Sequence, residues 1–74
     1  EGEEAMAERL VQKELARRVW TEEDLAGKSK TDRDKAGIAL RLRRETTMTL
    51  AWIAARLAMG SASMVTHCLR KQPQ

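Results

Sequence analysis

The sequence has little of what a catalytic or metal site requires. Its 74 residues include one cysteine (Cys68), one histidine (His67), one proline, and neither tyrosine nor phenylalanine. A single cysteine cannot form an internal disulfide bond, and one cysteine with one histidine cannot supply the ligands of a zinc site. No Gly-rich phosphate loop, paired-carboxylate site or nucleophile with a neighbouring base is recognisable. We therefore expect the chain to be no enzyme and to hold no cofactor and no metal ion.

Long hydrophobic runs are also missing. No apolar run approaches the roughly 18 residues that cross a bilayer, and no signal-peptide pattern is present. Hydrophobic residues make up 42% of the chain and charged residues 34%, which excludes both a disordered tail and a membrane span. We expect one small cytoplasmic domain with no membrane partner. Because the chain begins at Glu1 and not at methionine, we also expect it to be a piece of a longer protein.

Charge is unevenly distributed along the chain. Residues 1–24 contain eight acidic and four basic side chains, whereas residues 25–74 contain three acidic and ten basic ones. The net charge of +3 thus combines an acidic leader with a basic second part. We expect an acidic leader over 1–27 and a basic module over 28–74, forming one compact domain overall. A basic stretch of this kind is typical of nucleic-acid-binding proteins, although a merely soluble basic surface has the same pattern.

The spacing of apolar residues predicts an all-α fold. Glycine and proline together number five, strand-like alternation is absent, and apolar residues recur at three- and four-residue intervals almost throughout. Thr21 and Asp24 suit a capping box, and either Thr31 or Asp32 can cap the helix that follows the linker. The expected helices cover about residues 4–19, 22–26, 33–44, 50–59 and 62–71.

The last third of the chain predicts a helix-turn-helix motif. Residues 50–59 carry a clean apolar stripe, and Gly60 can stop this helix by adopting a positive φ. Ser61 or Ser63 can cap the helix over 62–71. Two short helices joined by a Gly-containing turn, after a third helix, are typical of this motif. We expect a three-helix core that binds DNA, with duplex DNA as the partner.

The outer side of the last helix would face the base edges in the major groove. The residues expected to contact DNA there and in the turn are Ser61, Ala62, Ser63, Thr66, His67, Arg70 and Lys71. Further contacts with DNA are expected from Thr47, Thr49, Arg43, Arg44 and Arg56. Two alternatives stay open: the basic cluster at 43–44 also suits the dipole of a helix end, and His67 also suits an ordinary surface position. We interpret Cys68 and both tryptophans as packing residues.

The alternative function is a protein–protein interaction module. The helix over 4–19 is amphipathic, and its apolar stripe, which includes Leu10 and Leu15, could dock on a partner protein or on a second copy. Such a stripe more often packs on its own domain. Binding of RNA or single-stranded DNA is a third hypothesis, against which the lack of tyrosine and phenylalanine counts.

The same residues resemble a known family. The segment over 34–61, with its core LRRETTMTLAWIAARLAMGS at 42–61, is similar to the C-terminal region of REP-associated tyrosine transposase-like proteins of bacteria. The segment WTEEDL at 20–25 fits the same region. The sequence departs from the family pattern in the linker over 28–33 and at Ala62 and Met64.

The resemblance implies a DNA-binding accessory region attached to a nuclease domain. In that family the nuclease would use a tyrosine nucleophile and a metal held by histidines to cut single-stranded DNA near palindromic repeats. This chain has no tyrosine and one histidine, so none of these catalytic residues can be carried over. The resemblance therefore implies that any nuclease domain lies upstream of Glu1.

Overall fold

The computed structural model of the chain describes residues 2–71, without the side chain of Lys71. This part of the chain contains five helices and no strands, which confirms the all-α class. The expected bounds differ from the observed ones by at most three residues. The helices are α1 (Glu3–Arg18), α2 (Glu22–Gly27), α3 (Arg33–Glu45), α4 (Leu50–Arg56) and α5 (Ala62–Lys71).

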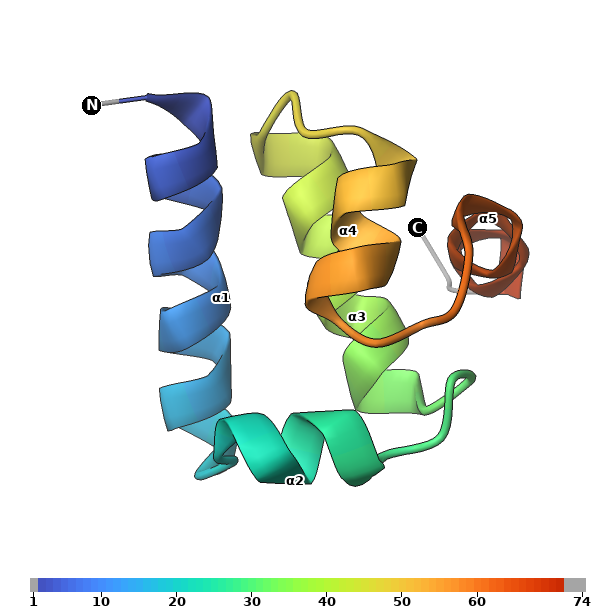
Figure 1. Cartoon of the computed structure of the whole chain (residues 1–74), viewed down its shortest axis with the longest axis horizontal. Helices are drawn as coiled ribbons and strands as arrows, with labels where there is room; N and C mark the ends of the chain where they lie inside the picture. The colour runs from blue at the N-terminus through green and yellow to red at the C-terminus, as the bar shows by residue number, and fades with distance from the viewer. Residues whose placement is uncertain (1, 72–74) are drawn as a thin grey trace.

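The helices are arranged around α3 and α4 (Figure 1). Helix α1 stands on one side and packs against α3, and α2 turns across the bottom of the molecule. Helix α5 packs against both α3 and α4 on the side away from α1. In this view α4 lies across the line of sight and α5 is seen end-on, so the two helices cross steeply. The outer side of α5 is consequently left uncovered by the other helices.

Two of the expected helix starts have the expected caps. Thr21 accepts a hydrogen bond from the amide of Asp24 (3.0 Å), and the Asp24 carboxylate accepts one from the amide of Thr21 (2.9 Å). This exchange is the capping box predicted for α2. Of the two candidates for α3, Asp32 is the cap, because its side chain accepts hydrogen bonds from two amides in the first turn. Local sequence signals were sufficient at both helix starts.

Helix α4 ends three residues earlier than expected, and Gly60 is not the residue that stops it. Ala58 adopts the left-handed conformation (φ 54°). The amides of Ala58 and Met59 then bond back to two carbonyls near the end of the helix, at 3.4 and 2.9 Å, in a Schellman motif. Gly60 does have a positive φ of 93°, but it lies within the turn. Ser61, and not Ser63, caps α5 by accepting an N–H at 3.3 Å.

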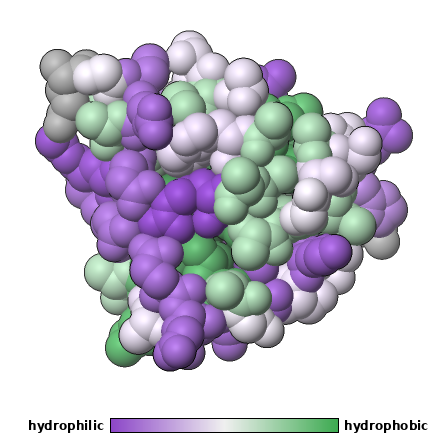
Figure 2. Space-filling model, viewed as in Figure 1, coloured by the Kyte–Doolittle hydropathy of each residue, from purple (hydrophilic) through white to green (hydrophobic). Residues whose placement is uncertain are grey.

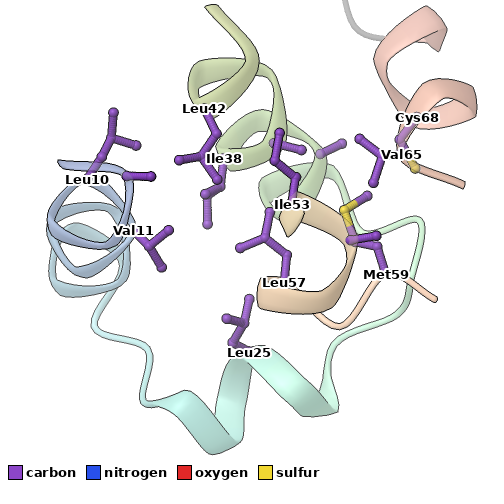
Figure 3. Packing of buried hydrophobic residues seen from close by; sticks show 14 of the residues in the cluster. Leu10, Val11, Leu25, Ile38, Leu42, Ile53, Leu57, Met59, Val65 and Cys68 are labelled. Carbon is purple, nitrogen blue, oxygen red and sulfur yellow. The ribbon is translucent and has the colours of Figure 1, made fainter. Parts of the chain in front are cut away.

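A single hydrophobic core connects all five helices (Figure 3). Buried side chains from each helix meet in it, including Val11 of α1, Leu25 of α2, Ile38 of α3, Ile53 of α4 and Val65 of α5. The acidic leader and the basic module therefore share one core. The apolar stripe of α1 packs on its own domain, which is the more common arrangement for such a helix.

Candidate nucleic-acid interface

The outward face of α5 is the first part of the candidate interface. Ser63, His67 and Arg70 are exposed and recur at intervals of four and three residues, so they share one face of the helix. Val65 and Cys68, on the opposite face, are buried in the core. This separation leaves a hydroxyl, an imidazole and a guanidinium group pointing away from the domain.

The other predicted residues on α5 are less accessible. Ala62 and Thr66 are half-buried, and the hydroxyl of Thr66 donates a hydrogen bond to the carbonyl of Ala62 (3.2 Å). Ser61 is exposed, but its hydroxyl caps the helix. Both hydroxyl oxygens still have capacity to accept a further hydrogen bond. The side chain of Lys71 lies outside the described part of the structure.

The connection between α3 and α4 carries the second part of the interface. Exposed side chains there are Thr47 and Thr49 in the connection itself and Arg43 and Arg44 in the last turn of α3. The hydroxyl of Thr49 caps α4 by accepting the amide of its first turn at 3.1 Å. The connection has a fixed shape because the buried Thr46 donates a hydrogen bond of 2.7 Å back to the last turn of α3. Two arginines and two threonines are thus held at one end of the α3–α4 pair.

Arg56, which was predicted to contact DNA, is instead occupied by ion pairs within the domain, and we leave it out of the proposed surface. Its guanidinium group bonds both oxygens of Glu8 at 2.6 and 2.7 Å and both oxygens of Glu22 at 2.9 and 2.8 Å. These hydrogen bonds, first from Glu8 and then from Glu22, raise the pKa of Arg56. The side chain is only 19% exposed. Arg56 instead fastens α1 and α2 to α4.

A second ion-pair cluster surrounds Glu14, which is buried although it is charged. Its carboxylate pairs with Arg18 at 2.5 Å and with Arg41 of α3, and Arg17 lies 3.6 Å away. Burial alone would raise the pKa of Glu14, but the hydrogen bonds from Arg18 and Arg41 outweigh it and hold the pKa below its ordinary value. This cluster joins α1 to α3. Its arginines are paired with a carboxylate, so their positive charge is largely neutralised.

The two clusters determine where free positive charge remains. Several basic side chains within residues 2–71 are exposed and have no acidic partner within ion-pair distance: Lys13, Lys30, Arg33, Arg43, Arg44 and Arg70. All of them except Lys13 belong to the basic module. Uncompensated positive charge is therefore concentrated on α3, on α5 and in the linker before α3, as a phosphate-binding surface requires.

Hydropathy separates the remaining surface into distinct regions (Figure 2). In this view hydrophilic residues gather over the side of α1 and α2, whereas an apolar region covers α4. Ala51, Ala55 and Ala58 are the exposed residues on and just after α4. Since these side chains carry neither charge nor hydrogen-bonding groups, this face has nothing that could bind a phosphate or a base edge. Trp20 and Trp52 are half-buried against the core, in agreement with their interpretation as packing residues.

Lys35 is a buried structural residue beside the candidate interface, and the sequence analysis did not predict it. Its side chain is fully buried, and its ammonium group donates hydrogen bonds to the carbonyls of Lys28 (3.1 Å) and Ala58 (3.3 Å). Burial lowers the pKa of Lys35, and Asp32 partly opposes this shift. A signal was present, because Lys35 precedes Ile38, Ala39 and Leu42 at the spacing of the apolar stripe of α3. A lysine on such a stripe indicates an internal hydrogen-bonding role.

The ion pairs of Arg56 predict an acid-sensitive fold. Hydrogen bonding from Arg56 lowers the pKa of both Glu8 and Glu22 below the ordinary 4.5. A carboxyl group with a lowered folded-state pKa stabilises the fold above its unfolded-state pKa, and this stabilisation is lost as the pH falls through the folded-state value. We therefore expect Glu8→Gln to lower the melting temperature at pH 7, and the difference from the unmodified chain to shrink between pH 5 and pH 3.

The matched control for this experiment is Glu23→Gln, which removes an exposed carboxylate of α2 that has no ion pair in the described structure. Thermal unfolding followed by circular dichroism across this pH range measures both variants. A Glu8→Gln effect at pH 7 no larger than that of Glu23→Gln would contradict the role given to the Arg56 cluster.

Comparisons of the chain with protein-family models, with curated proteins and with solved structures find no match. Among the described residues, no group of three or more His, Cys, Asp or Glu side chains is placed to hold a metal ion. Within the same residues, no helix combines the length and apolar character needed to cross a bilayer.

Proposed function

We propose that the chain is a DNA-binding module in which α3, α4 and α5 act as a helix-turn-helix unit and α5 enters the major groove of duplex DNA. One observation carries this proposal. The exposed stripe Ser63–His67–Arg70 lies opposite the buried side of α5, on a domain whose unpaired arginines also belong to its basic part. A helix has the width that the major groove admits, and a polar outer face is what base edges require.

The proposal includes two kinds of contact with DNA, one to phosphates and one to base edges. Arg43 and Arg44 contact phosphates, release condensed counterions and supply most of the affinity. On α5, Arg70 can donate two hydrogen bonds to the O6 and N7 atoms of guanine, while Ser63 and His67 can bond to other base edges or to phosphates. A monomer with one short reading helix would bind weakly and would recognise only a few base pairs.

The parent protein is part of the same proposal. The resemblance over residues 42–61 supports a C-terminal accessory region of a transposase-like bacterial protein, with any nuclease activity in another domain of that protein. In such a protein this module would hold DNA while the other domain performs the chemistry. The proposal for DNA binding rests on the geometry of α5 and does not depend on this assignment.

The packing of α1 disfavours the alternative in which this helix docks on a protein partner. Leu10 and Leu15, which would form the docking stripe, are only 9% and 3% exposed because they pack against the core. The large apolar side chains that remain exposed in residues 2–71 are Met6 and Val19, which lie near opposite ends of α1. They do not form the continuous stripe that helix docking requires.

A salt titration tests the proposed function. Fluorescence anisotropy with a labelled duplex of about 20 base pairs measures the association constant. Its logarithm should fall linearly with the logarithm of the salt concentration. We expect a slope of about −3, which corresponds to three or four phosphate contacts. A single strand of the same length and composition should compete poorly. The absence of binding in dilute buffer, or an affinity independent of salt, would overturn the proposal.

A further inference from the structure

The linker before α3 is fixed against the turn between α4 and α5. The buried ammonium group of Lys35 holds it there by bonding the carbonyl of Lys28, in the linker, and the carbonyl of Ala58, in the turn. Both carbonyls belong to residues that follow helix ends, where partial negative charge accumulates and a cation is favoured. The linker is therefore part of the surface beside α5.

Lys30 is the side chain that this arrangement presents. Its Nζ atom lies 3.3 Å from the position that a Cβ atom on Gly60 would occupy, so the lysine side chain lies directly over the turn. Its carbonyl is 3.6 Å from the thiol of Cys68, which donates a weak hydrogen bond from α5. Lys30 is nevertheless exposed and has no acidic partner in the described structure. A free ammonium group is thus held beside the N-terminal end of α5.

The acidic residues near Lys30 are occupied elsewhere. The carboxylate of Asp32 accepts two amides at the start of α3, and Asp34 lies 3.6 Å from the guanidinium group of Arg18. Arg33, like Lys30, is exposed and has no acidic partner within the described residues. The linker therefore presents net positive charge to solvent.

The linker lies at the opposite end of α3 from Arg43 and Arg44. Arg44 follows Arg33 by eleven positions, which corresponds to about 16 Å along a helix. The major groove is about 12 Å wide between its two phosphate backbones. In Figure 1, α5 lies between the level of the linker and the level of the α3–α4 connection. The spacing of the two basic ends therefore suits the two strands that border one major groove.

We propose that Lys30 and Arg33 form a second phosphate-binding element, which contacts the strand across the major groove from the strand that Arg43 and Arg44 contact. This inference rests on the proposed function, because it places α5 in that groove. The ligand is the sugar–phosphate backbone of duplex DNA. The element fixes the register of α5 from both sides of the groove and carries no sequence preference of its own.

The test compares Lys30→Ala with Lys13→Ala in salt titrations against the same duplex. Lys13 is the matched control because it is exposed, has the same charge and lies on α1, away from α5. Lys30→Ala is expected to weaken binding roughly threefold in low salt and to reduce the salt slope by about 0.9, the contribution of one phosphate contact. Lys13→Ala should change neither quantity, and Lys30→Arg should restore both.

The outcomes separate this inference from the proposed function. If the unmodified chain binds but Lys30→Ala and Lys13→Ala have equal salt slopes, the second phosphate-binding element is overturned. The proposal that α5 enters the major groove would be unaffected. No salt-dependent binding by the unmodified chain would overturn both proposals. Circular dichroism of Lys30→Ala should match that of the unmodified chain, because the substituted side chain is exposed.

Discussion

Replacement of Arg43, Arg44 and Arg70 by alanine is expected to abolish most of the affinity for duplex DNA. Arg43 and Arg44 each neutralise one phosphate in the proposal, so the salt slope should become shallower by about 1.8. The affinity in low salt should fall about 100-fold, because the contact of Arg70 with guanine is lost as well. The three side chains are exposed and have no ion-pair partner in the described structure, so the triple variant should keep its fold. Anisotropy titrations at several salt concentrations measure both quantities.

The control is a triple variant that removes the same charge from α1: Arg9→Ala, Lys13→Ala and Arg17→Ala. Because Arg17 lies 3.6 Å from the buried Glu14, circular dichroism must first show that this variant keeps its fold. Helix α1 lies on the far side of α3 and α4 from α5. We expect this control to lose less than threefold in affinity, because only the long-range attraction between the net charges changes. Equal losses in the two triple variants would show that net charge, and not the proposed surface, determines binding.

Lys35→Ala is expected to produce a large loss of stability, about 3 kcal/mol. The substitution removes a fully buried alkyl chain, leaves a cavity and orphans the carbonyls of Lys28 and Ala58. Lys35→Met keeps most of the buried volume and removes only the ammonium group. We therefore expect it to cost about 1–2 kcal/mol, the penalty of the carbonyls left without a partner.

Urea denaturation of the two Lys35 variants checks this ordering. If Lys35→Ala were no more destabilising than an alanine replacement of the exposed Lys13, the buried position of Lys35 would be contradicted. Lys35→Met has a second readout, because loss of the linker's attachment should also weaken DNA binding through Lys30. Lys35→Met thus tests whether the attachment of the linker to the turn is needed for the DNA contact of Lys30.

The helices could be predicted from sequence because their signals are local. The three- and four-residue spacing of apolar side chains depends only on the helical repeat. The capping box at Thr21 and Asp24 spans four consecutive residues, and it forms as predicted. The exposed stripe on α5 could be predicted by the same reasoning, since the buried positions Val65 and Cys68 determine which face points outward.

The errors concern features that the local sequence does not contain. Arg56 looks like a free basic residue at the end of a helix, but its partner Glu8 is 48 residues away and reaches it only through the packing of α1. The early end of α4 depends on Ala58, which adopts a conformation that glycine ordinarily favours. Met59 packs into the core directly after this turn, and the local sequence does not predict that packing.

Chemical-shift mapping of the ¹⁵N-labelled chain with duplex DNA tests the central claim most directly, because it reports both binding and the face that is used. The account predicts that the perturbed amides cluster at Ser63, His67 and Arg70 on α5, at the α3–α4 connection and at Lys30. It predicts little change along the outer side of α1. Perturbations confined to α1, or a spectrum unchanged by excess duplex, would contradict the claim that the outer face of α5 binds DNA.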